Sequence, residues 1–356
     1  MPTVEINGSR INYCQVDCKS GNDCEDLVMI HGLATSLAFW YFSHAAEFSK
    51  RYRVTLYDMR GHGRSGITES GYTSNNMAVD LQKLIDHLKI DRAHFIAHSF
   101  GGVVALNLAC IDPDRIASLM LIDTHIFAVR RLPKTKKWKS ADSIQQILDK
   151  NGLDIDVKEP YFGYRLLSTV ARMQTQNIEI SEELKNMVNH LMWKNNKRTA
   201  SRWLKLMETT KAEEELMGDD GLSLNSLRKL KFPILALYGE FSPAMPTGEQ
   251  LLEVWSHADF RRIRKAGHFF PITRPFEFMK NCQQFWDGAL IKELPRREGD
   301  YNKRHFRSER FFKEDDKWYF YTRESKKIGP FDDIEKAREF LRSEFISDMI
   351  IEKPVK

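Results

Sequence analysis

The sequence has no segment of the kind that carries a chain into or across a membrane. Residues 1–13 contain acidic and polar residues throughout, whereas a signal peptide begins with basic residues followed by a continuous apolar stretch. No apolar run approaches the roughly 20 residues that span a bilayer. We therefore expect neither a signal peptide nor a transmembrane segment.

Cysteine is scarce, and its spacing argues against the common zinc motifs. The 356 residues include five cysteines, an odd number. We therefore expect free thiols in a reducing cytoplasm rather than a disulfide framework. Cys14, Cys18 and Cys24 lie close together, but the CxxC pairs of structural zinc sites are missing. We predict a cytoplasmic protein without a metal site.

The net charge of the chain is small for its length. Lys and Arg number 54 against 49 Asp and Glu, a formal net charge of +5. The body of the chain has no dense basic stripe with interleaved aromatic residues, so binding to nucleic acid is not expected. Hydrophobic residues make up 42%, enough for a real core, and the length suits one large domain plus a smaller one.

The first 123 residues alternate short apolar runs with helical patterns. The apolar runs, typical of buried strands in a parallel sheet, are 27–30, 54–57, 95–97 and 119–122. Amphipathic or apolar helical patterns lie between the later runs, at 77–88 and 103–111. This alternation predicts an α/β fold with right-handed crossovers.

A helical segment interrupts this pattern. Helical periodicity dominates residues 124–231, and the α/β rhythm returns with strand-like runs at 232–238 and 260–263. We therefore predict an α/β core of residues 1–123 and 232–294. Residues 124–231 are predicted to form an inserted helical cap, or lid.

The end of the chain predicts a small α+β module. Residues 295–308 hold too few apolar residues to pack and are predicted to be a linker. In residues 309–356, two strand-like runs flank the sequence KEDDK, a third ends at Gly329–Pro330, and Asp332 is expected to cap a helix. The module has no cluster of nucleophile, base or metal-ligand residues, so we expect docking or regulation from it.

Ser99 lies in the sequence AHSFGG, between a predicted strand and a predicted helix. A nucleophile at such a turn adopts a strained backbone, which requires small residues two positions before and after it. Ala97 and Gly101 meet this requirement. The helix that follows directs its first amides toward developing negative charge. We predict that Ser99 is a nucleophile.

Two backbone amides are predicted to form an oxyanion hole. Gly32 permits a tight turn after the run 27–30, which allows the amide of Leu33 to face the site together with that of Phe100. The side chain of His31 is expected to brace this loop rather than to transfer protons.

His268 is the predicted general base. It lies late in the chain on the glycine-containing loop AGHFFP, and histidine is the side chain best suited to take a proton from serine near neutral pH. His98 and Phe269, the sequence neighbours of the nucleophile and the base, are predicted to contact the substrate.

Four motifs together resemble those of the α/β-hydrolase superfamily: HGL at 31–33, DMRGHGRS at 58–65, AHSFGG at 97–102 and AGHFFP at 266–271. They occur in the family's order and spacing, and the resemblance covers about residues 1–290. It implies an eight-stranded, mostly parallel sheet, a helical cap, and a Ser–His–acid triad that acts without a metal or organic cofactor. The tail is similar to small uncharacterised modules appended to bacterial proteins.

The acid of this triad departs from the family pattern. The family commonly has an Asp three residues after a Gly in the loop that follows the strand at 232–238, where this chain has Ser242. A hydroxyl carries no charge to balance an imidazolium, so Ser242 cannot be the acid. Asp123, at the end of the run 119–122, is favoured on sheet geometry, and Glu240 is the alternative.

The cap supplies most of the candidate substrate contacts. Its apolar and aromatic side chains favour a hydrophobic acyl substrate, although most of them are expected to pack between helices: Phe162, Tyr164, Leu166, Met173, Trp193, Trp203 and Met207. The basic run 130–139 is expected to be a solvated face of the cap. Its alternative role is to dock an acidic carrier, an acyl carrier protein or a coenzyme A thioester.

These features predict a serine esterase or thioesterase that acts on a small hydrophobic acyl substrate through an acyl-enzyme. Hydrolysis of a lactone, a lipid or a C–C bond on the same triad is one alternative. A ligand-binding sensor that retains the hydrolase fold is the other.

Overall fold

The computed structural model describes residues 1–21, 24–132, 138, 140–159, 161–179, 181–191, 197–291, 311–321, 327–337 and 340. The chain divides into two compact units, Met1–Glu293 and Leu294–Lys356. Each unit is considered by itself. The predicted linker 295–308 lies outside the described residues.

The first unit is built on an eight-stranded sheet in the order β1-β2-β4-β3-β5-β6-β7-β8. Strands β1 and β2 are antiparallel, as are β2 and β4, and all further pairs are parallel. The strands are β1 (Thr3–Ile6), β2 (Ser9–Val16), β3 (Asp26–Ile30), β4 (Arg53–Tyr57), β5 (Ala93–His98), β6 (Ile116–Ile122), β7 (Ile234–Gly239) and β8 (Asp259–Ile263). The predicted fold class is confirmed.

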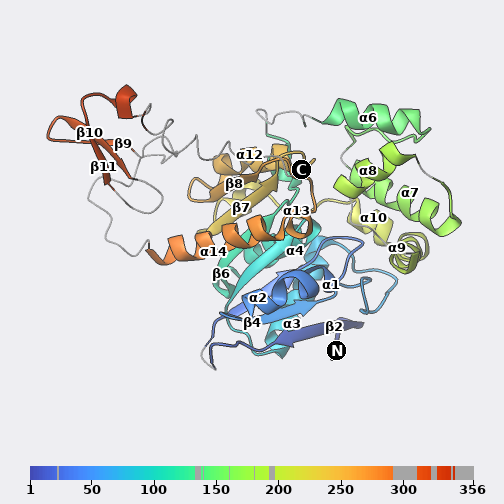
Figure 1. Ribbon diagram of the computed structural model, residues 1–356. Coiled ribbons are helices and arrows are strands. Elements are labelled where there is room, and N and C mark those ends of the chain that lie inside the picture. The colour runs from blue at the N-terminus through green and yellow to red at the C-terminus, as the bar shows by residue number, and fades with distance from the viewer. Residues whose placement is uncertain are drawn as a thin grey trace, which may run out of the picture. The chain divides into compact units, whose positions relative to one another are not determined.

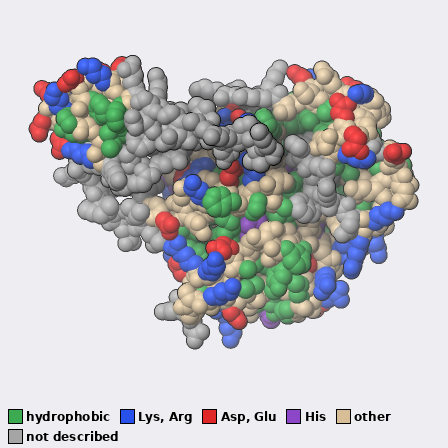
Figure 2. Space-filling view, in the orientation of Figure 1, with side chains coloured by type: hydrophobic (Ala, Val, Ile, Leu, Met, Phe, Trp, Pro, Cys, Tyr) green, Lys and Arg blue, Asp and Glu red, His purple; other side chains and the backbone are tan. Residues whose placement is uncertain are grey.

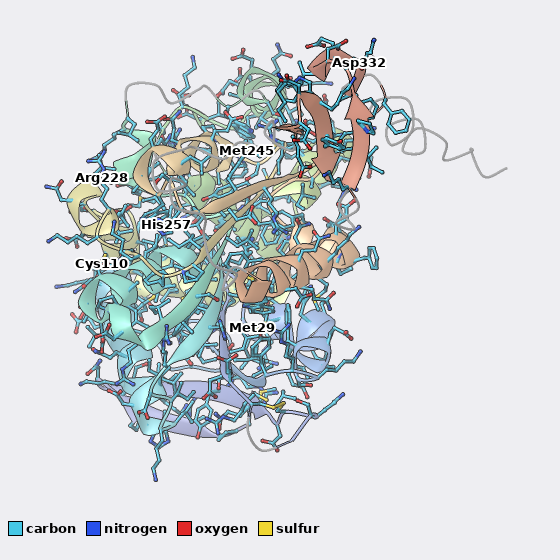
Figure 3. All side chains as sticks on the ribbon, turned by 90° about the vertical axis from the view of Figure 1, so that its left-hand side faces the viewer. Met29, Cys110, Arg228, Met245, His257 and Asp332 are labelled. Atoms are coloured by element: carbon cyan, nitrogen blue, oxygen red, sulfur yellow. A yellow bond between two sulfur atoms is a disulfide. The ribbon has the colours of Figure 1, made fainter. Side chains whose placement is uncertain are left out.

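Helices cover both faces of this sheet (Figure 1). In β3, Val28 and Ile30 belong to one buried cluster, and Leu27 and Met29 belong to the other, because successive side chains of a strand point to opposite faces. Met29 lies inside the molecule, as Figure 3 shows. Burial on both faces explains why the central strands read as continuous apolar runs.

Each face has its own set of helices. The first cluster includes residues of α3 (Ser74–His87), α4 (Phe100–Ile111) and α12 (Met245–Val254). The second includes residues of α1 (Ala38–Trp40), α2 (Ala46–Phe48) and α14 (Pro275–Ile291). A short π-helical turn, η1 (Tyr41–Ala45), joins α1 to α2.

The segment between β6 and β7 is helical wherever it has regular structure among its described residues. Its helices are α5 (Phe127–Arg130), α6 (Ala141–Lys150), α7 (Phe162–Gln176), α8 (Glu182–Leu191), α9 (Lys197–Thr209), α10 (Ala212–Leu216) and α11 (Leu224–Leu227). Buried Trp203 on α9 donates its indole N–H to the hydroxyl of Ser168 on α7, at 3.1 Å. These two helices pack through their amphipathic faces.

The second unit contains a three-stranded antiparallel sheet in the order β11-β10-β9. Its strands are β9 (Phe311–Glu314), β10 (Lys317–Tyr321) and β11 (Lys327–Phe331). The predicted helix cap is wrong by one residue. The amide of Lys336 donates to the carboxylate of Asp333 at 2.8 Å, whereas Asp332 pairs with Lys317 at 2.6 Å.

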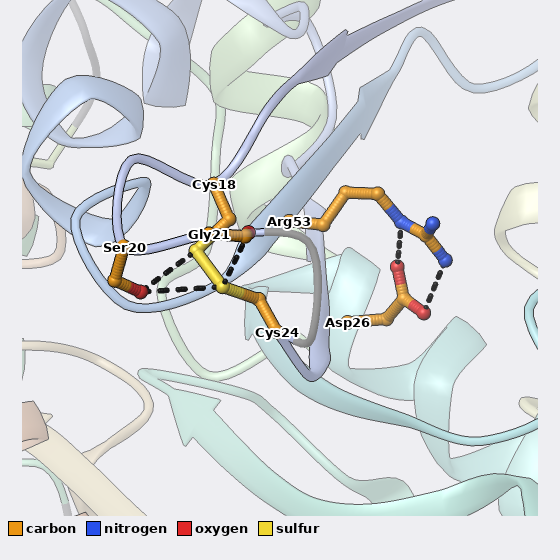
Figure 4. Close-up of a disulfide and its surroundings, with 6 residues drawn as sticks. All are labelled: Cys18, Ser20, Gly21, Cys24, Asp26 and Arg53. Carbon is orange, nitrogen blue, oxygen red and sulfur yellow. Dashed lines mark hydrogen bonds and ion pairs between the residues drawn. A yellow bond between two sulfur atoms is a disulfide. The ribbon is translucent and has the colours of Figure 1, made fainter.

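Cys18 and Cys24 form a disulfide, so the expectation of free thiols is wrong for these two residues (Figure 4). Both cysteines lie in the connection between β2 and β3, and their Cα atoms are 6.3 Å apart, which is within the range for a disulfide. Cys14, Cys110 and Cys282 are free. The cytoplasmic location that we inferred from free thiols stays a prediction.

Basic and acidic side chains are both spread over the face shown in Figure 2. None of the helices among the described residues is both long enough and apolar enough to cross a bilayer.

Candidate active site

Ser99 occupies the turn between β5 and α4, at the carboxyl end of a central strand. Its φ of 55° and ψ of −124° are unusual for a residue with a side chain. The turn is also crowded, since a Cβ atom at Gly101 would lie 2.5 Å from the carbonyl oxygen of His31. These constraints explain the glycine two residues after the serine and expose the Ser99 hydroxyl to the pocket.

His268 lies between Ser99 and Asp123. It belongs to the loop that joins β8 to α13 (Phe270–Thr273). Its Nε2 atom lies 3.0 Å from the Ser99 Oγ atom, and its Nδ1 atom lies 2.6 Å from Oδ2 of Asp123. Since a carboxylate oxygen accepts hydrogen bonds, Nδ1–H donates to Asp123, and Nε2 is left to accept from the Ser99 hydroxyl.

Asp123 follows β6 and is completely buried. Its Oδ1 atom accepts from the amide of Gly239 at 2.8 Å, and its Oδ2 atom also accepts from the hydroxyl of Ser242. Ser242, at the position where the family commonly has its acid, therefore orients the carboxylate. Glu240 instead accepts from the amide of Lys265 at 2.7 Å. The structure thus brings Asp123 to His268 and directs Glu240 elsewhere.

The predicted oxyanion-hole residues, Leu33 and Phe100, both line the pocket with Ser99. Phe100 is the first residue of α4, so its amide lies in the first turn, where no intrahelical acceptor is available. Gly32 lies close to the nucleophile, since a Cβ atom there would be 3.0 Å from the Cβ atom of Ser99. The two amides thus belong to segments that meet at Ser99.

His31 holds the loop that carries Leu33. Its Nε2 atom accepts from the amide of Met59 at 3.1 Å, so its Nδ1–H donates to the carbonyl of Gly32 at 2.7 Å. Burial lowers the pKa of His31 to about 4 and keeps the ring neutral. These contacts agree with the bracing role that we expected.

His98 and Phe269, the two predicted substrate contacts, also line the pocket. His98 is almost fully buried and stacks on Phe39, with ring centroids 4.8 Å apart. Burial, with His268 nearby, lowers its pKa well below the usual value, and its Nε2–H donates to the carbonyl of His268 at 3.0 Å. His98 therefore also holds the His268 loop in place, a role that the sequence did not indicate.

The pocket above Ser99 has mostly apolar walls. Of the residues singled out in the predicted cap, Phe162, Tyr164 and Leu166 line it. Met173, Trp203 and Met207 pack among the helices instead. Trp193 lies outside the described residues.

Two polar pocket residues, His125 and Arg130, were not predicted to lie there. The expectation of a solvated basic face suits Arg131, which is exposed, but is wrong for Arg130. Residues 133–137 and 139 of the basic run lie outside the described part of the chain. Whether a residue of this run lies in the pocket depends on how α5 packs, and residue type alone does not predict it.

Family comparison supports this architecture. Residues 27–275 match the model of the alpha/beta hydrolase fold family. Residues 296–350 match a family described as a domain of unknown function (DUF6316).

Two relatives match part of the chain. The dihydrolipoyllysine-residue acetyltransferase component of the acetoin cleaving system from Pseudomonas putida is 36% identical over 119 residues, which cover 33% of this chain and 31% of that protein. A protein from Variovorax paradoxus (strain S110) that carries the name carbamate hydrolase RutD is 38% identical over 102 residues, 28% of this chain and 38% of its own length. The chain thus matches well under half of each relative's length.

A solved structure resembles most of the chain. The enol-lactonase from Burkholderia xenovorans LB400 aligns with a TM-score of 0.56 and 24% identity, covering 80% of this chain and 100% of that one. At this identity the likeness concerns the fold alone.

Proposed function

Because the chain belongs to the alpha/beta hydrolase fold family, we propose that it is a serine hydrolase that cleaves esters or thioesters of hydrophobic acyl groups. One observation carries the proposal. Ser99, His268 and Asp123, from three distant parts of the chain, form one hydrogen-bonded series with distances of 3.0 Å and 2.6 Å. This arrangement of nucleophile, base and acid is the one that acyl transfer requires.

In the first half of the reaction, Oγ of Ser99 attacks the substrate's carbonyl carbon while Nε2 of His268 takes the hydroxyl proton. Asp123 keeps the imidazole in the correct tautomer and stabilises the imidazolium that forms. His268 then gives the proton to the leaving alcohol or thiol, and an acyl group remains on Ser99.

In the second half, His268 takes a proton from water, and the resulting hydroxide attacks the acyl-enzyme. The amides of Leu33 and Phe100 donate to the oxyanion in both tetrahedral intermediates. The proton returns to Ser99 as the acid leaves. The complete reaction consumes one water molecule for each ester or thioester and needs no other co-substrate.

The walls of the pocket support the substrate class. Phe127, Phe162, Leu166 and Leu167 face the space next to Ser99, and apolar walls of this kind favour burial of a hydrophobic acyl chain. We propose residues 124–231 as the cap that supplies these walls. Thioesters of acyl carrier protein or coenzyme A remain candidate substrates, with the lysines of the basic run 130–139 as the docking surface.

A fluorophosphonate probe tests the nucleophile. The intact protein is expected to take up one probe per chain, and peptide mapping is expected to place it on Ser99. Ser99→Ala is expected to abolish labelling, whereas the control Ser226→Ala, a capping residue of α11, is expected to label normally. Labelling that persists in Ser99→Ala would contradict the proposal.

A panel of substrates then identifies the type of bond that the protein hydrolyses. p-Nitrophenyl esters and acyl-coenzyme A thioesters of increasing chain length are expected to show kcat/KM rising with chain length. Lactones and carbamates in the same panel separate the ester activity from the activities named for related proteins. Labelling of Ser99 without turnover of any panel member would instead support a ligand-binding sensor.

A further inference from the structure

Arg130 places a positive charge in a largely apolar pocket. It lies at the end of α5 and lines the same space as Ser99 and His268. Burial lowers the pKa of its guanidinium, and no neighbouring carboxylate raises it. In the described part of the chain, the Arg130 guanidinium has no ion-pair partner. A partly desolvated guanidinium of this kind costs free energy unless an anion compensates it.

The partner that holds Arg130 in place is a neutral ring. Nη1 of Arg130 lies 3.1 Å from Nε2 of His125. Arginine only donates, so Nε2 is the acceptor and Nδ1 carries the ring proton, which it donates to the hydroxyl of Thr247 at 3.1 Å. Burial and the nearby Arg130 and His268 lower the pKa of His125 to about 3. The contact therefore orients the guanidinium without neutralising its charge.

The acidic residues of the pocket are bound to backbone amides. Glu215 accepts from the amides of Gly71 and Tyr72 at 2.8 Å and 2.6 Å. Asp220 accepts from the amide of Phe127 at 2.9 Å, and Asp219 accepts from that of Gly221 at 2.8 Å. These bonds hold the acids in place, and none of the three forms an ion pair with Arg130 among the described residues.

We propose that Arg130 binds a carboxylate carried by the substrate, so that the enzyme selects esters or thioesters whose apolar body ends in an acid group. The inference rests on the proposed function and specifies its substrate class. A guanidinium presents a planar set of five donors, of which His125 uses one, and this geometry matches a carboxylate. The apolar walls of the same pocket would hold the hydrophobic part of the molecule.

Matched ester pairs test the proposal on the intact protein. For the acyl side, mono-p-nitrophenyl suberate is compared with its neutral methyl ester. For the leaving-group side, 4-carboxyphenyl octanoate is compared with 4-(methoxycarbonyl)phenyl octanoate. We expect the charged member of one pair to have the higher kcat/KM, and the pair that shows this effect identifies the end of the substrate that Arg130 binds.

Substitutions then assign the preference to one side chain. Arg130→Gln is expected to lower the charged-to-neutral ratio of kcat/KM about 10- to 100-fold, the range for loss of a charge-assisted hydrogen bond. Arg130→Lys is expected to restore part of the ratio, because it keeps the charge but not the planar donors. Arg131→Gln, which removes an exposed charge from the next position, is the matched control and is expected to leave the ratio unchanged.

The possible failures are distinguishable. If Ser99 is labelled and esters are hydrolysed, but the ratio is the same in Arg130→Gln as in the unmodified chain, the inference is overturned and the proposed function stands. An equal fall in Arg131→Gln would show that only the general charge of this region matters, which also overturns it. If the probe does not label Ser99 and neither pair is hydrolysed, both proposals fail together.

Discussion

The carboxyl-terminal edge of the sheet and the helical segment between β6 and β7 surround one pocket but are built in different ways. At the sheet edge, the backbone positions the reactive groups. Ser99 and Asp123 both have positive φ values, 55° and 52°, and both follow neighbouring parallel strands. In the helical segment, the pocket is lined by side chains of amphipathic helices, such as Leu167 on α7.

This difference suits two separate tasks, which are holding the reactive groups in place and selecting the substrate. A strained backbone held by several strands is hard to change without unfolding, which suits a geometry that must hold to a fraction of an ångström. Side chains on a helix can be exchanged at low cost, which suits the choice of substrate. We therefore expect substitutions at the sheet edge to lower turnover of every substrate, and substitutions in the helical segment to change the order of preference.

Ser99→Ala is the strongest test of the sheet edge. Removal of the nucleophile is expected to lower kcat by about 10⁶-fold for all esters, because the remaining groups cannot form an acyl-enzyme. Stopped assays with p-nitrophenyl esters at high enzyme concentration measure the residual rate. A rate within tenfold of the unmodified chain would show that the chemistry is located elsewhere.

The acid gives the next largest effect. Asp123→Asn is expected to lower kcat about 10⁴-fold, since the amide can donate to Nδ1 and so favour the wrong tautomer of His268. Glu240→Gln is the matched control, with one carboxylate removed from the neighbouring loop, and its turnover is expected to be nearly normal. Circular dichroism checks that both variants are folded. Near-normal turnover in Asp123→Asn together with a loss in Glu240→Gln would reverse the assignment of the acid.

Most of the sheet edge could be predicted from the sequence because strands, turns and small residues there occur in a fixed order. The rule that parallel strands end at the same edge favours Asp123 as the acid, and in the structure its Oδ2 atom lies 2.6 Å from Nδ1 of His268. The antiparallel strands β1 and β2 were not located individually, because Thr3–Ile6 and Ser9–Val16 mix polar and apolar residues. Such segments lack the continuous apolar runs that mark the central strands.

The helical segment was predictable as helix but not as a binding surface. Periodicity identifies the buried face of a helix, but it does not tell which buried side chains meet another helix and which border a cavity. Phe162 and Met173 have similar apolar character on α7, yet only Phe162 is among the pocket residues that the structure describes. The Cys18–Cys24 disulfide was missed for a related reason, because it depends on the path of a short loop.

Leu167→Ala tests the helical segment with a smaller expected effect. Loss of apolar contact in the pocket is expected to lower the ratio of kcat/KM for p-nitrophenyl octanoate over p-nitrophenyl acetate by about threefold to tenfold. Met173→Ala, on the same helix but away from the pocket lining, is expected to keep the ratio. Equal changes in both variants would mean that general loosening of α7, rather than contact with substrate, causes the effect.

The last test concerns the stability of the core under acid rather than turnover. His44 lies buried in η1 and donates Nε2–H to the carbonyl of Pro271 at 3.0 Å, and burial lowers its pKa to about 4. An unfolded histidine has a pKa of about 6.5. Above that pH the ring is neutral in both the folded and the unfolded chain, so its protonation does not affect the free energy of unfolding.

As the pH falls from about 6.5 toward about 4, the unfolded chain binds a proton that the folded chain does not, so the free energy of unfolding falls. The slope for one such histidine approaches about 1.4 kcal/mol per pH unit. His44→Phe is expected to reduce the loss between pH 7 and pH 5 by about 1 to 2 kcal/mol in urea unfolding. His87→Gln, at an exposed position of α3, is expected to leave it unchanged. An unaltered acid dependence in His44→Phe would mean that His44 is protonated in the folded core, or that the core opens locally before it unfolds.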